Sequence, residues 1–422
     1  MDKLVIEGGL PLKGEVRISG SKNACLPIMS ACLLTDDKCM IDNIPQLKDV
    51  LTMSEILSFL GVDMELGERA IVRKSGSYEN FTAPYDIVST MRASICVLGP
   101  LLAKKKKAKV SFPGGCVIGP RPIDLHIKGL RALGAEIKIE GGYIVARAKK
   151  LQGANIYLGG HFGSSVLATA NVMMAATLAR GESVIHCAAC EPEIADLAKF
   201  LIKMGAKIEG YSTPIIKIKG VRSLHGARHR IMPDRIETGT YMIASCITGG
   251  SLHLKGAESS HLMAVIDVLR QANCLILKTE RGLLVKRAKR DLSPVSVSTL
   301  PYPGFPTDMQ AQIMSLMCVA NGISVVTEKI FPERFIHISE LNRMGSQIFL
   351  EGPSAVISGV AKLSGARVMA SDLRASAALV LAGLVARGKT EVHRIYHLDR
   401  GYECIEEKLS KVGARIKRIK DD

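Results

Sequence analysis

The stretch LGAEIK at residues 133–138 carries the pattern that decides the fold: the apolar end of a helix, a glycine, and the first residues of a strand. Glycine suits the position after a helix because it takes a positive φ angle without steric strain, and the alternating residues that follow favour a strand. The pattern recurs about every seventy residues, so repeated units account for the whole chain. Its six copies begin at Leu60, Leu133, Met204, Ala272, Met344 and Val412.

A second pattern, offset within each repeat, is a short polar start followed by a helix of Ala, Met, Leu and Ile. Ser, Thr and Asp are natural N-caps, and helices that are apolar nearly all round are buried. We therefore expect each repeat to be a sheet-and-helix module with an inward helix, and six modules to pack as two three-repeat domains. The polar starts are SKNA at Ser21, STMRAS at Ser89, SSVLAT at Ser164, DRIETG at Asp234, TDMQAQ at Thr307 and SDLRAS at Ser371.

Equivalent helix N-termini face one way within each such domain, and their unpaired N–H groups favour anions. Polar residues at these points converge, so we expect a substrate cleft between the two domains. The residues that would line it are Lys22, Asn23, Arg92, Asp234, Asp308, Asp372 and Arg374.

Composition predicts a globular protein of about two or three domains. The chain has 422 residues, 47% of them hydrophobic, and neither an apolar run long enough to span a membrane nor a signal-peptide pattern. Eleven scattered cysteines fit reduced thiols rather than a disulfide framework. We expect a cytoplasmic protein without membrane insertion.

The net charge of +16 favours anionic partners, which include nucleic acid, membrane surfaces and phosphorylated metabolites. A basic repeat protein that grips nucleic acid without catalysis is one alternative. Only 4% of the residues are aromatic, so stacking platforms are lacking. Asp234, Asp308 and Asp372 would also repel a phosphate backbone beside the basic motif residues. We therefore expect no nucleic-acid partner.

Residues 111–126, SFPGGCVIGPRPIDLH, predict an exposed loop, because Gly and Pro interrupt helices and strands. This loop holds the thiol of Cys116 five positions before Arg121. A nearby cation favours the thiolate and brings its pKa towards neutrality, where it exchanges protons usefully. On this segment alone, a glycine-rich turn with an incidental cysteine remains the alternative.

Six motifs stand together in order and spacing over essentially the whole chain: SGSKNA (19–24), PGGC with GPRPIDLH (113–126), PDRIETGT (233–240), FPTDMQAQ (305–312), DLRAS (372–376) and HLDRGYE (397–403). Together they resemble the UDP-N-acetylglucosamine 1-carboxyvinyltransferase family of enolpyruvyl transferases. The resemblance implies two inside-out α/β domains, each of three sheet-and-helix repeats with buried helices. It also implies domain limits: residues 22–231, which carry the Cys116 loop, form one domain, and residues 1–21 plus 232–422 form the other. The active site is expected in the cleft between them.

The implied reaction transfers the enolpyruvyl group of phosphoenolpyruvate to the 3′-hydroxyl of UDP-N-acetylglucosamine by addition–elimination. Phosphate is released, and the product begins peptidoglycan synthesis. The family needs no cofactor and no metal, and nothing in this sequence resembles a metal cluster. The sister enzyme that acts on shikimate 3-phosphate is the nearest alternative, but it lacks the PGGC loop.

By resemblance, Cys116 donates the proton to C3 of phosphoenolpyruvate, and the epoxide fosfomycin should alkylate it. Asp308 is expected to accept the proton of the hydroxyl. Lys22, Arg121 and Arg400 would hold the phosphate and carboxylate of phosphoenolpyruvate. The expected catalytic residues are Cys116, Asp308, Lys22 and Arg400. The expected substrate-binding residues are Lys22, Asn23, Arg92, Arg121, Pro122, Ile123, Asp124, Leu125, Ser165, Val166, Asp308, Ile330, Arg374 and Arg400.

Some positions keep two interpretations. Asp234 and Asp372 could be helix caps or site residues, and Arg374 could form an intrachain ion pair. One position departs from the family: Leu167 in SVLAT stands where a glycine is usual. The resemblance therefore does not decide whether Ser165 and Val166 contact the diphosphate.

Overall fold

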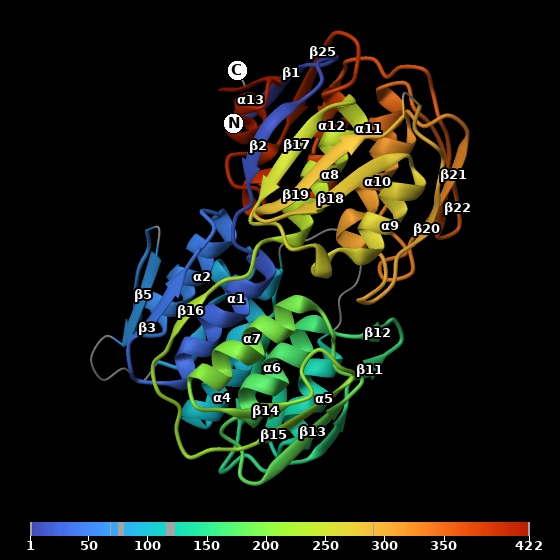
Figure 1. The fold of residues 1–422 in the computed structure, drawn as a ribbon. Coiled ribbons are helices and arrows are strands. Elements are labelled where there is room, and N and C mark those ends of the chain that lie inside the picture. The colour runs from blue at the N-terminus through green and yellow to red at the C-terminus, as the bar shows by residue number, and fades with distance from the viewer. Residues whose placement is uncertain (1, 68, 75–79, 115–122, 290, 421–422) are drawn as a thin grey trace. The chain divides into compact units, whose positions relative to one another are not determined.

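The computed structural model describes residues 2–420 except 68, 75–79, 115–122 and 290. The described residues form two compact units (Figure 1). The terminal unit joins the residues up to Ser19 to those from Pro233 onward, and the middle unit runs from Gly20 to Met232.

The described part of the middle unit contains three four-stranded sheets with strand orders β16-β3-β5-β4, β6-β7-β9-β8 and β10-β13-β15-β14. In each sheet the first-named strand runs parallel to its neighbour and the other pairings are antiparallel. A small β11–β12 pair accompanies them. The strands are β3 (Cys39–Asp42), β4 (Val62–Glu65), β5 (Arg69–Lys74), β6 (Thr82–Ala83), β7 (Lys107–Ser111), β8 (Glu136–Glu140), β9 (Tyr143–Arg147), β10 (Asn155–Tyr157), β11 (Gly159–Gly160), β12 (Gly163–Ser164), β13 (Glu182–His186), β14 (Lys207–Glu209), β15 (Ile215–Lys219) and β16 (Arg228–Arg230).

The described part of the terminal unit repeats this design in three sheets with orders β2-β17-β19-β18, β20-β21-β23-β22 and β24-β25-β1-β26. The first pair of each is again parallel. The strands are β1 (Asp2–Glu7), β2 (Lys13–Arg17), β17 (Ser251–Lys255), β18 (Cys274–Thr279), β19 (Gly282–Arg287), β20 (Ser296–Ser298), β21 (Ile323–Thr327), β22 (Gln347–Glu351), β23 (Ser354–Ser358), β24 (Arg367–Met369), β25 (Lys389–His393) and β26 (Arg415–Lys420).

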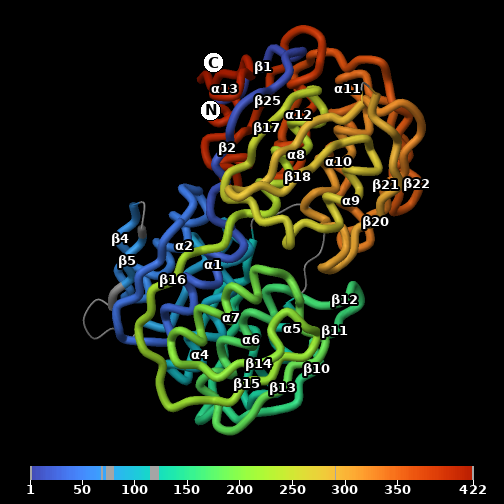
Figure 2. The backbone as a smooth tube through the Cα atoms, viewed as in Figure 1, coloured from blue at the N-terminus to red at the C-terminus, as the bar shows by residue number. Residues whose placement is uncertain are grey.

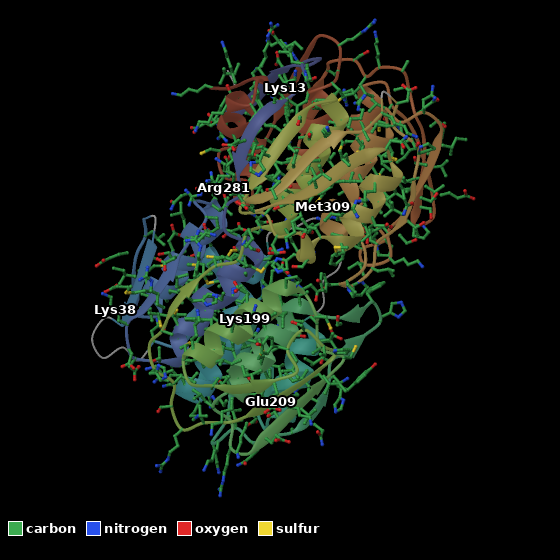
Figure 3. The ribbon with its side chains drawn as sticks, viewed as in Figure 1. Lys13, Lys38, Lys199, Glu209, Arg281 and Met309 are labelled. Carbon is green, nitrogen blue, oxygen red and sulfur yellow. The ribbon has the colours of Figure 1, made fainter. Side chains whose placement is uncertain are left out.

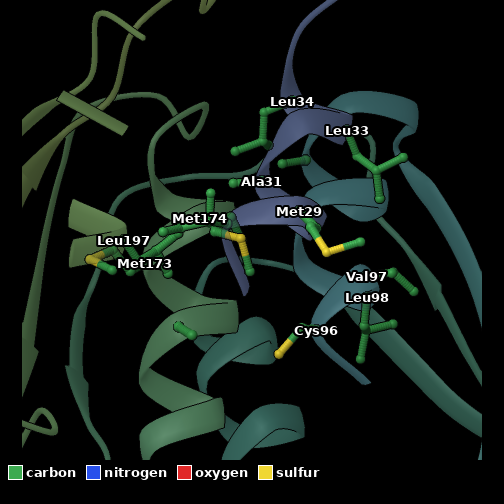
Figure 4. Close-up of a cluster of buried hydrophobic side chains, with 14 of the residues drawn as sticks. Met29, Ala31, Leu33, Leu34, Cys96, Val97, Leu98, Met173, Met174 and Leu197 are labelled. Atoms are coloured by element: carbon green, nitrogen blue, oxygen red, sulfur yellow. The ribbon is translucent and has the colours of Figure 1, made fainter. Parts of the chain in front are cut away.

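The apolar helices fill the centre of each unit, as their sequences predict. In the middle unit α1, α4 and α6 are buried along most of their length, and Figure 4 shows their side chains packed together. In the terminal unit α8, α10 and α12 take the same place. These helices are α1 (Lys22–Ala31), α4 (Leu98–Lys105), α6 (Val166–Ala176), α8 (Arg235–Thr248), α10 (Gln310–Met317) and α12 (Leu373–Gly383).

The remaining helices end each repeat or connect its parts. Charged side chains such as Lys38, Lys199 and Glu209 are exposed around the middle unit (Figure 3). The helices are η1 (Cys32–Leu34), α2 (Lys48–Phe59), α3 (Tyr85–Val88), η2 (Arg92–Val97), α5 (Asp124–Ala132), α7 (Pro192–Lys203), η3 (Ser259–His261), α9 (Met263–Gln271), η4 (Thr307–Met309), α11 (Ile338–Arg343), η5 (Ile395–Arg400) and α13 (Ile405–Lys411).

The predicted helix–glycine–strand pattern is confirmed in all six copies. Each helix ends two residues before the glycine position, and a strand begins one or two residues after it. The residue at the glycine position has a positive φ every time, which is the conformation that glycine and asparagine tolerate best. These residues and angles are Gly61 (78°), Gly134 (90°), Gly205 (100°), Asn273 (66°), Gly345 (88°) and Gly413 (101°).

Four of the six polar starts are helix caps, and two are not. Ser21, Ser165, Asp234 and Asp372 accept hydrogen bonds from the first turn of their helices.

The prediction was wrong for Ser89 and Thr307. The backbone N–H of Ser89 closes the preceding helix α3 by bonding to Tyr85. The hydroxyl of Thr307 donates to Glu328 instead. In both repeats the chain enters the buried helix through a 3₁₀ turn, η2 or η4.

The N-terminal strand lies inside a sheet of the terminal unit. β1 pairs antiparallel with β25 on one side and with β26 on the other. Both chain ends therefore lie in this unit, as Figure 2 shows. In the described chain, no helix is both long and apolar enough to cross a bilayer.

Candidate active site

In the terminal unit, Asp308 lies in η4 between two buried arginines. Its Oδ1 accepts a hydrogen bond from Nη1 of Arg334 at 2.9 Å, and its Oδ2 accepts one from Nη2 of Arg374 at 2.9 Å. The arginine side chains are 5% and 3% exposed, whereas that of Asp308 is 27% exposed. Solvent and ligands therefore reach the carboxylate more easily than they reach the arginines.

The charge state of Asp308 follows from these contacts. Burial by itself raises the pKa of its carboxyl, but the charges of Arg374 and Arg334 outweigh that effect and hold the pKa well below its usual range. Asp308 is therefore ionised at neutral pH. Its oxygens can accept a hydrogen bond from a hydroxyl, although the two arginines weaken the carboxylate as a base.

Arg374 is held at the start of α12. The carboxylate of Asp372 caps this helix by accepting from the backbone N–H of Arg374 at 2.7 Å. The guanidinium lies over the ring of Tyr402, 5.5 Å from its centroid. Its Nε and Nη1 are buried and have no hydrogen-bond partner among the described residues. Asp372 is thus a cap, and the predicted ion pair of Arg374 is made with Asp308.

Ile330 is joined to the same cluster through Glu328, which follows β21. Oε1 of Glu328 accepts the backbone N–H of Ile330 at 2.8 Å. Oε2 of Glu328 accepts the hydroxyl of Thr307, the residue before Asp308, at 2.8 Å. One carboxylate therefore holds two segments that carry predicted site residues.

Arg400 is the last residue of η5, also in the terminal unit, and its side chain is half-buried. Burial lowers the pKa of the neighbouring His397, and the positive charge of Arg400 lowers it further. His397 is therefore neutral at pH 7.

In the middle unit, Lys22 begins α1 directly after its cap, Ser21, and Asn23 follows. The Nζ atom of Lys22 forms an ion pair with Oδ2 of Asp49 at 3.1 Å. Both side chains are largely buried, with 11% and 5% exposure. A cation beside the positive end of a helix suits an anionic ligand, because both attract negative charge.

Arg92 begins η2, and its Nη1 donates to the carbonyl oxygen of Pro113 at 3.3 Å. Pro113 is one of the last described residues before the glycine-rich loop. The predicted site residues Cys116, Arg121 and Pro122 lie outside the described residues.

A buried asparagine links the elements that carry the other predicted residues of the middle unit. Asn171 in α6 donates from Nδ2 to the carbonyl oxygen of Ile95 in η2 and to Nδ1 of His126 in α5, at 2.8 and 2.9 Å. Its Oδ1 accepts the backbone N–H of Gly99 at 2.8 Å. A Cβ on Gly99 would overlap the carbonyl oxygen of Asn171, so glycine permits this close approach of α4 and α6.

Asn171 thereby fixes the protonation of His126. Its amide group is a donor in this contact, so Nδ1 of His126 must be an unprotonated acceptor. Burial lowers the pKa of His126 to about 3, with a further contribution from Arg92. His126 therefore has a structural role at neutral pH.

The starts of α5 and α6 carry the remaining predicted residues. Ile123 is buried at the N-cap of α5, Asp124 is exposed and Leu125 is half-buried. Ser165 caps α6 by accepting from the backbone N–H of Ala168 at 3.3 Å.

Val166 and Leu167 follow Ser165 in the first turn of α6. The side chain of Leu167, at the position that departs from the family pattern, packs against the core of the middle unit together with Val166.

Comparison with known proteins identifies the family of this chain. A family model described as EPSP synthase (3-phosphoshikimate 1-carboxyvinyltransferase) matches residues 6–409. The chain belongs to this family of enolpyruvyl transferases. Within the family, it is 55% identical over 419 residues to the UDP-N-acetylglucosamine 1-carboxyvinyltransferase of Nitratidesulfovibrio vulgaris (strain DP4), covering 99% of both chains. It is 53% identical to the protein of that name from Rhodospirillum centenum, with both chains fully covered.

Solved structures confirm the predicted enolpyruvyl transferase fold. The enolpyruvyl transferase NikO from Streptomyces tendae matches with a TM-score of 0.89 at 22% identity, covering 100% of this chain and 99% of that one. EPSP synthase from Acinetobacter baumannii matches with a TM-score of 0.76 at 17% identity, with both chains fully covered.

Four residues of these clusters were not predicted. Arg334 and Asp49 act through partners that are 26 and 27 residues away in sequence. Glu328 joins its near neighbour Ile330 to Thr307, which is 21 residues away, and none of the three residues belongs to a recognised motif. Asn171 lies within the apolar sequence of α6. A polar residue inside an otherwise apolar buried helix is the one signal that could have identified it, because such a residue needs internal partners.

Proposed function

We propose that this chain transfers the enolpyruvyl group of phosphoenolpyruvate to the 3′-hydroxyl of UDP-N-acetylglucosamine, with release of phosphate, as the first committed step of peptidoglycan synthesis. The observation that carries this proposal is the match to relatives of that name, 50–55% identical over nearly the whole of both chains. The enzyme would thereby serve cell-wall formation, cell shape and division.

In the proposed reaction the hydroxyl oxygen bonds to C2 of phosphoenolpyruvate while C3 gains a proton. Loss of phosphate from C2 and of a proton from C3 then restores the double bond. Asp308 accepts the hydroxyl proton and Cys116 supplies the proton to C3. Fosfomycin, which mimics phosphoenolpyruvate, would alkylate the same thiol.

The ion pairs of Asp308 with Arg334 and Arg374 conflict with its proposed role as a general base. A general base works best with a pKa near the working pH, and Asp308 paired with Arg334 and Arg374 lies far below it. We therefore propose that bound substrate takes over one arginine contact. Arg374 suits this exchange, because its Nε and Nη1 have no partner among the described residues.

Anionic groups of the substrates would be held by the cationic residues. We propose that Lys22, Arg121 and Arg400 bind the phosphate and carboxylate of phosphoenolpyruvate. We also propose that residues 22–231 and residues 1–21 plus 232–422 act as domains that both line the active site. The nucleotide-sugar residues would be Asn23, Arg92, Arg121, Pro122, Ile123, Asp124, Leu125, Ser165, Val166, Asp308 and Ile330.

We further propose a cytoplasmic location. The cysteines of the described part of the chain are free thiols, which fits a reducing compartment. The proposed substrates are small molecules, and we expect neither nucleic acid nor membrane as a partner.

A phosphate-release assay tests the proposed function. Phosphoenolpyruvate with UDP-N-acetylglucosamine should release phosphate and yield the enolpyruvyl ether, detected by mass spectrometry. Phosphoenolpyruvate with shikimate 3-phosphate should release none. Release with shikimate 3-phosphate alone would assign the sister activity. No release with either acceptor, combined with salt-sensitive binding of nucleic acid, would favour the non-catalytic alternative.

A further inference from the structure

Glu328 is a fully buried carboxylate, and both of its oxygens accept hydrogen bonds. It follows β21 and is 0% exposed. Its Oε1 accepts the hydroxyl of Thr299 at 2.6 Å and the backbone N–H groups of Ile330 and Phe331 at 2.8 and 3.0 Å. Its Oε2 accepts the hydroxyl of Thr307 at 2.8 Å. A buried charge is tolerated only when it is satisfied in this way.

The two oxygens of Glu328 serve different segments. Oε1 holds the turn that contains Ile330, and Thr299 completes this arm by accepting the backbone N–H of Lys329 at 2.9 Å. Oε2 holds only Thr307, which leads into Asp308. The side chain therefore has one arm for the Ile330 turn and one for η4.

The second arm continues to the reacting carboxylate. Because the hydroxyl hydrogen of Thr307 points to Glu328, the lone pairs of that oxygen are free to accept. Nη1 of Arg334 donates to this oxygen at 3.0 Å and to Oδ1 of Asp308 at 2.9 Å. Thr307 thus fixes the guanidinium that in turn fixes one oxygen of Asp308.

We propose that Glu328 is a positioning residue for Asp308 and Ile330. This role rests on the enolpyruvyl transfer proposed above. The contact of Oε2 supports the rate of the chemical step, because it positions Asp308. The contacts of Oε1 support the affinity for the nucleotide sugar, because they position Ile330.

The substitution Glu328→Gln separates the arms. The amide oxygen can stay at the Oε1 position, where three donors require an acceptor. The NH₂ group then faces Thr307 and donates to its hydroxyl oxygen, so the hydroxyl hydrogen loses its acceptor and turns to the third position around that oxygen. A neutral hydrogen bond replaces the charge-assisted one, so Thr307 and the Arg334 contact that it supports are held less firmly, while the Ile330 turn is kept.

We expect Glu328→Gln to lower kcat about 10- to 100-fold, because a small displacement of a catalytic group has effects of that size. The KM for UDP-N-acetylglucosamine should change less than about threefold. The pH dependence is read in Thr307→Val, which leaves the charge of Glu328 in place. In that variant the acidic limb of the kcat–pH profile should move to higher pH, because a weaker hold of Arg334 on Asp308 raises the pKa of that carboxyl.

Two threonine variants test the arms individually and protect the test against misfolding of the glutamine variant. Thr307→Val should reproduce the loss of kcat and show the shift of the acidic limb, and Thr307→Ser should restore the wild-type values of both. Thr299→Val should chiefly raise the KM for UDP-N-acetylglucosamine. In the double variant Glu328→Gln with Thr307→Val, the losses should not add, because both variants break one arm.

The matched control is Glu391→Gln. Glu391 is another largely buried carboxylate of the terminal unit with several partners, among them Lys3 and Lys389, but none of these partners is a proposed site residue. The kcat of the Glu391→Gln variant and the acidic limb of its kcat–pH profile should equal those of the wild type. The proposal is overturned if Thr307→Val and Glu328→Gln leave both quantities unchanged, or if Glu391→Gln alters them equally. A wild-type protein that releases no phosphate would instead refute the proposed function.

Discussion

At the scale of single residues, the contacts of Asp308 separate two roles of one carboxylate. As an ion-pair partner it satisfies two buried arginines, and as the proposed base it must give up part of that pairing. Its ionised form is favoured in the folded protein, so its contribution to stability is present above the ordinary pKa of an aspartate and is lost as the pH falls through the lowered value.

The substitution Asp308→Asn should remove both roles. We expect kcat to fall at least about 100-fold, because a positioned base contributes 10²–10⁴-fold. The free energy of unfolding should fall by about 1–3 kcal/mol, less than for a fully buried pair because Asp308 is partly exposed. Phosphate release and urea denaturation measure the two effects. The control Asp267→Asn, at an exposed position of α9 in the same unit, should change neither. Wild-type kcat in the Asp308 variant would exclude it as the base.

At the scale of elements, Asn171 joins η2, α5 and α6, and one of its partners, His126, can accept its hydrogen bond only as a neutral ring. His126 has a pKa of about 3 in the folded protein against an ordinary value of 6.5. Between these values the unfolded chain binds a proton that the folded chain does not. Stability therefore decreases as the pH falls, with a slope of up to about 1.4 kcal/mol per pH unit from this residue.

The substitution His126→Gln should remove that slope and keep an acceptor for Asn171. At pH 7 the variant should be less stable than the wild type, since the shape of the glutamine side chain differs from that of the imidazole ring. The difference should shrink as the pH is lowered from about 6.5 to 4, by up to about 1.4 kcal/mol per pH unit. Urea denaturation at several pH values measures it. A difference that is constant over this range would show that His126 is not held neutral.

The elements also show what the sequence could predict. The six helix ends were predictable because a positive φ is a local requirement that only glycine and asparagine meet easily, as Gly134 and Asn273 illustrate. Caps such as Asp234 are local too. Ser89 and Thr307 were predicted wrongly because their hydrogen bonds go to residues outside the helix that follows.

The site was predictable only where a motif marks it. Lys22, Asp308 and Arg374 stand in recognisable motifs, and the structure brings the last two into direct contact. Arg334, Glu328 and Asp49 enter the clusters by long-range packing, which no local pattern encodes.

At the scale of the whole molecule, the two units have separate cores. The N-terminal strand contributes Leu4 and Ile6 to the core of the terminal unit, and both side chains are 0% exposed. Damage to this strand should therefore affect residues of the terminal unit more than two hundred positions away and leave the core of the middle unit, which begins at Gly20, intact.

The substitution Leu4→Ala should lower the free energy of unfolding of the terminal unit by about 2–5 kcal/mol through the cavity it leaves. Hydrogen exchange followed by mass spectrometry should show faster exchange in β25 and β26 and unchanged exchange in α1 and α6. The reciprocal variant Ile41→Ala, in β3, should show the opposite distribution. Equal acceleration of both units by Leu4→Ala would contradict independent cores.

The position of β1 between β25 and β26 also sets an order of events on the ribosome. β1 is made before both of its neighbours, so one of its edges stays unpaired until β25 has emerged and the other until β26 has emerged. The middle unit is complete in translation long before that and can fold first. Nascent chains that stop short of Lys389 would thus leave β1 without either neighbour, which makes them natural clients for chaperones and proteases.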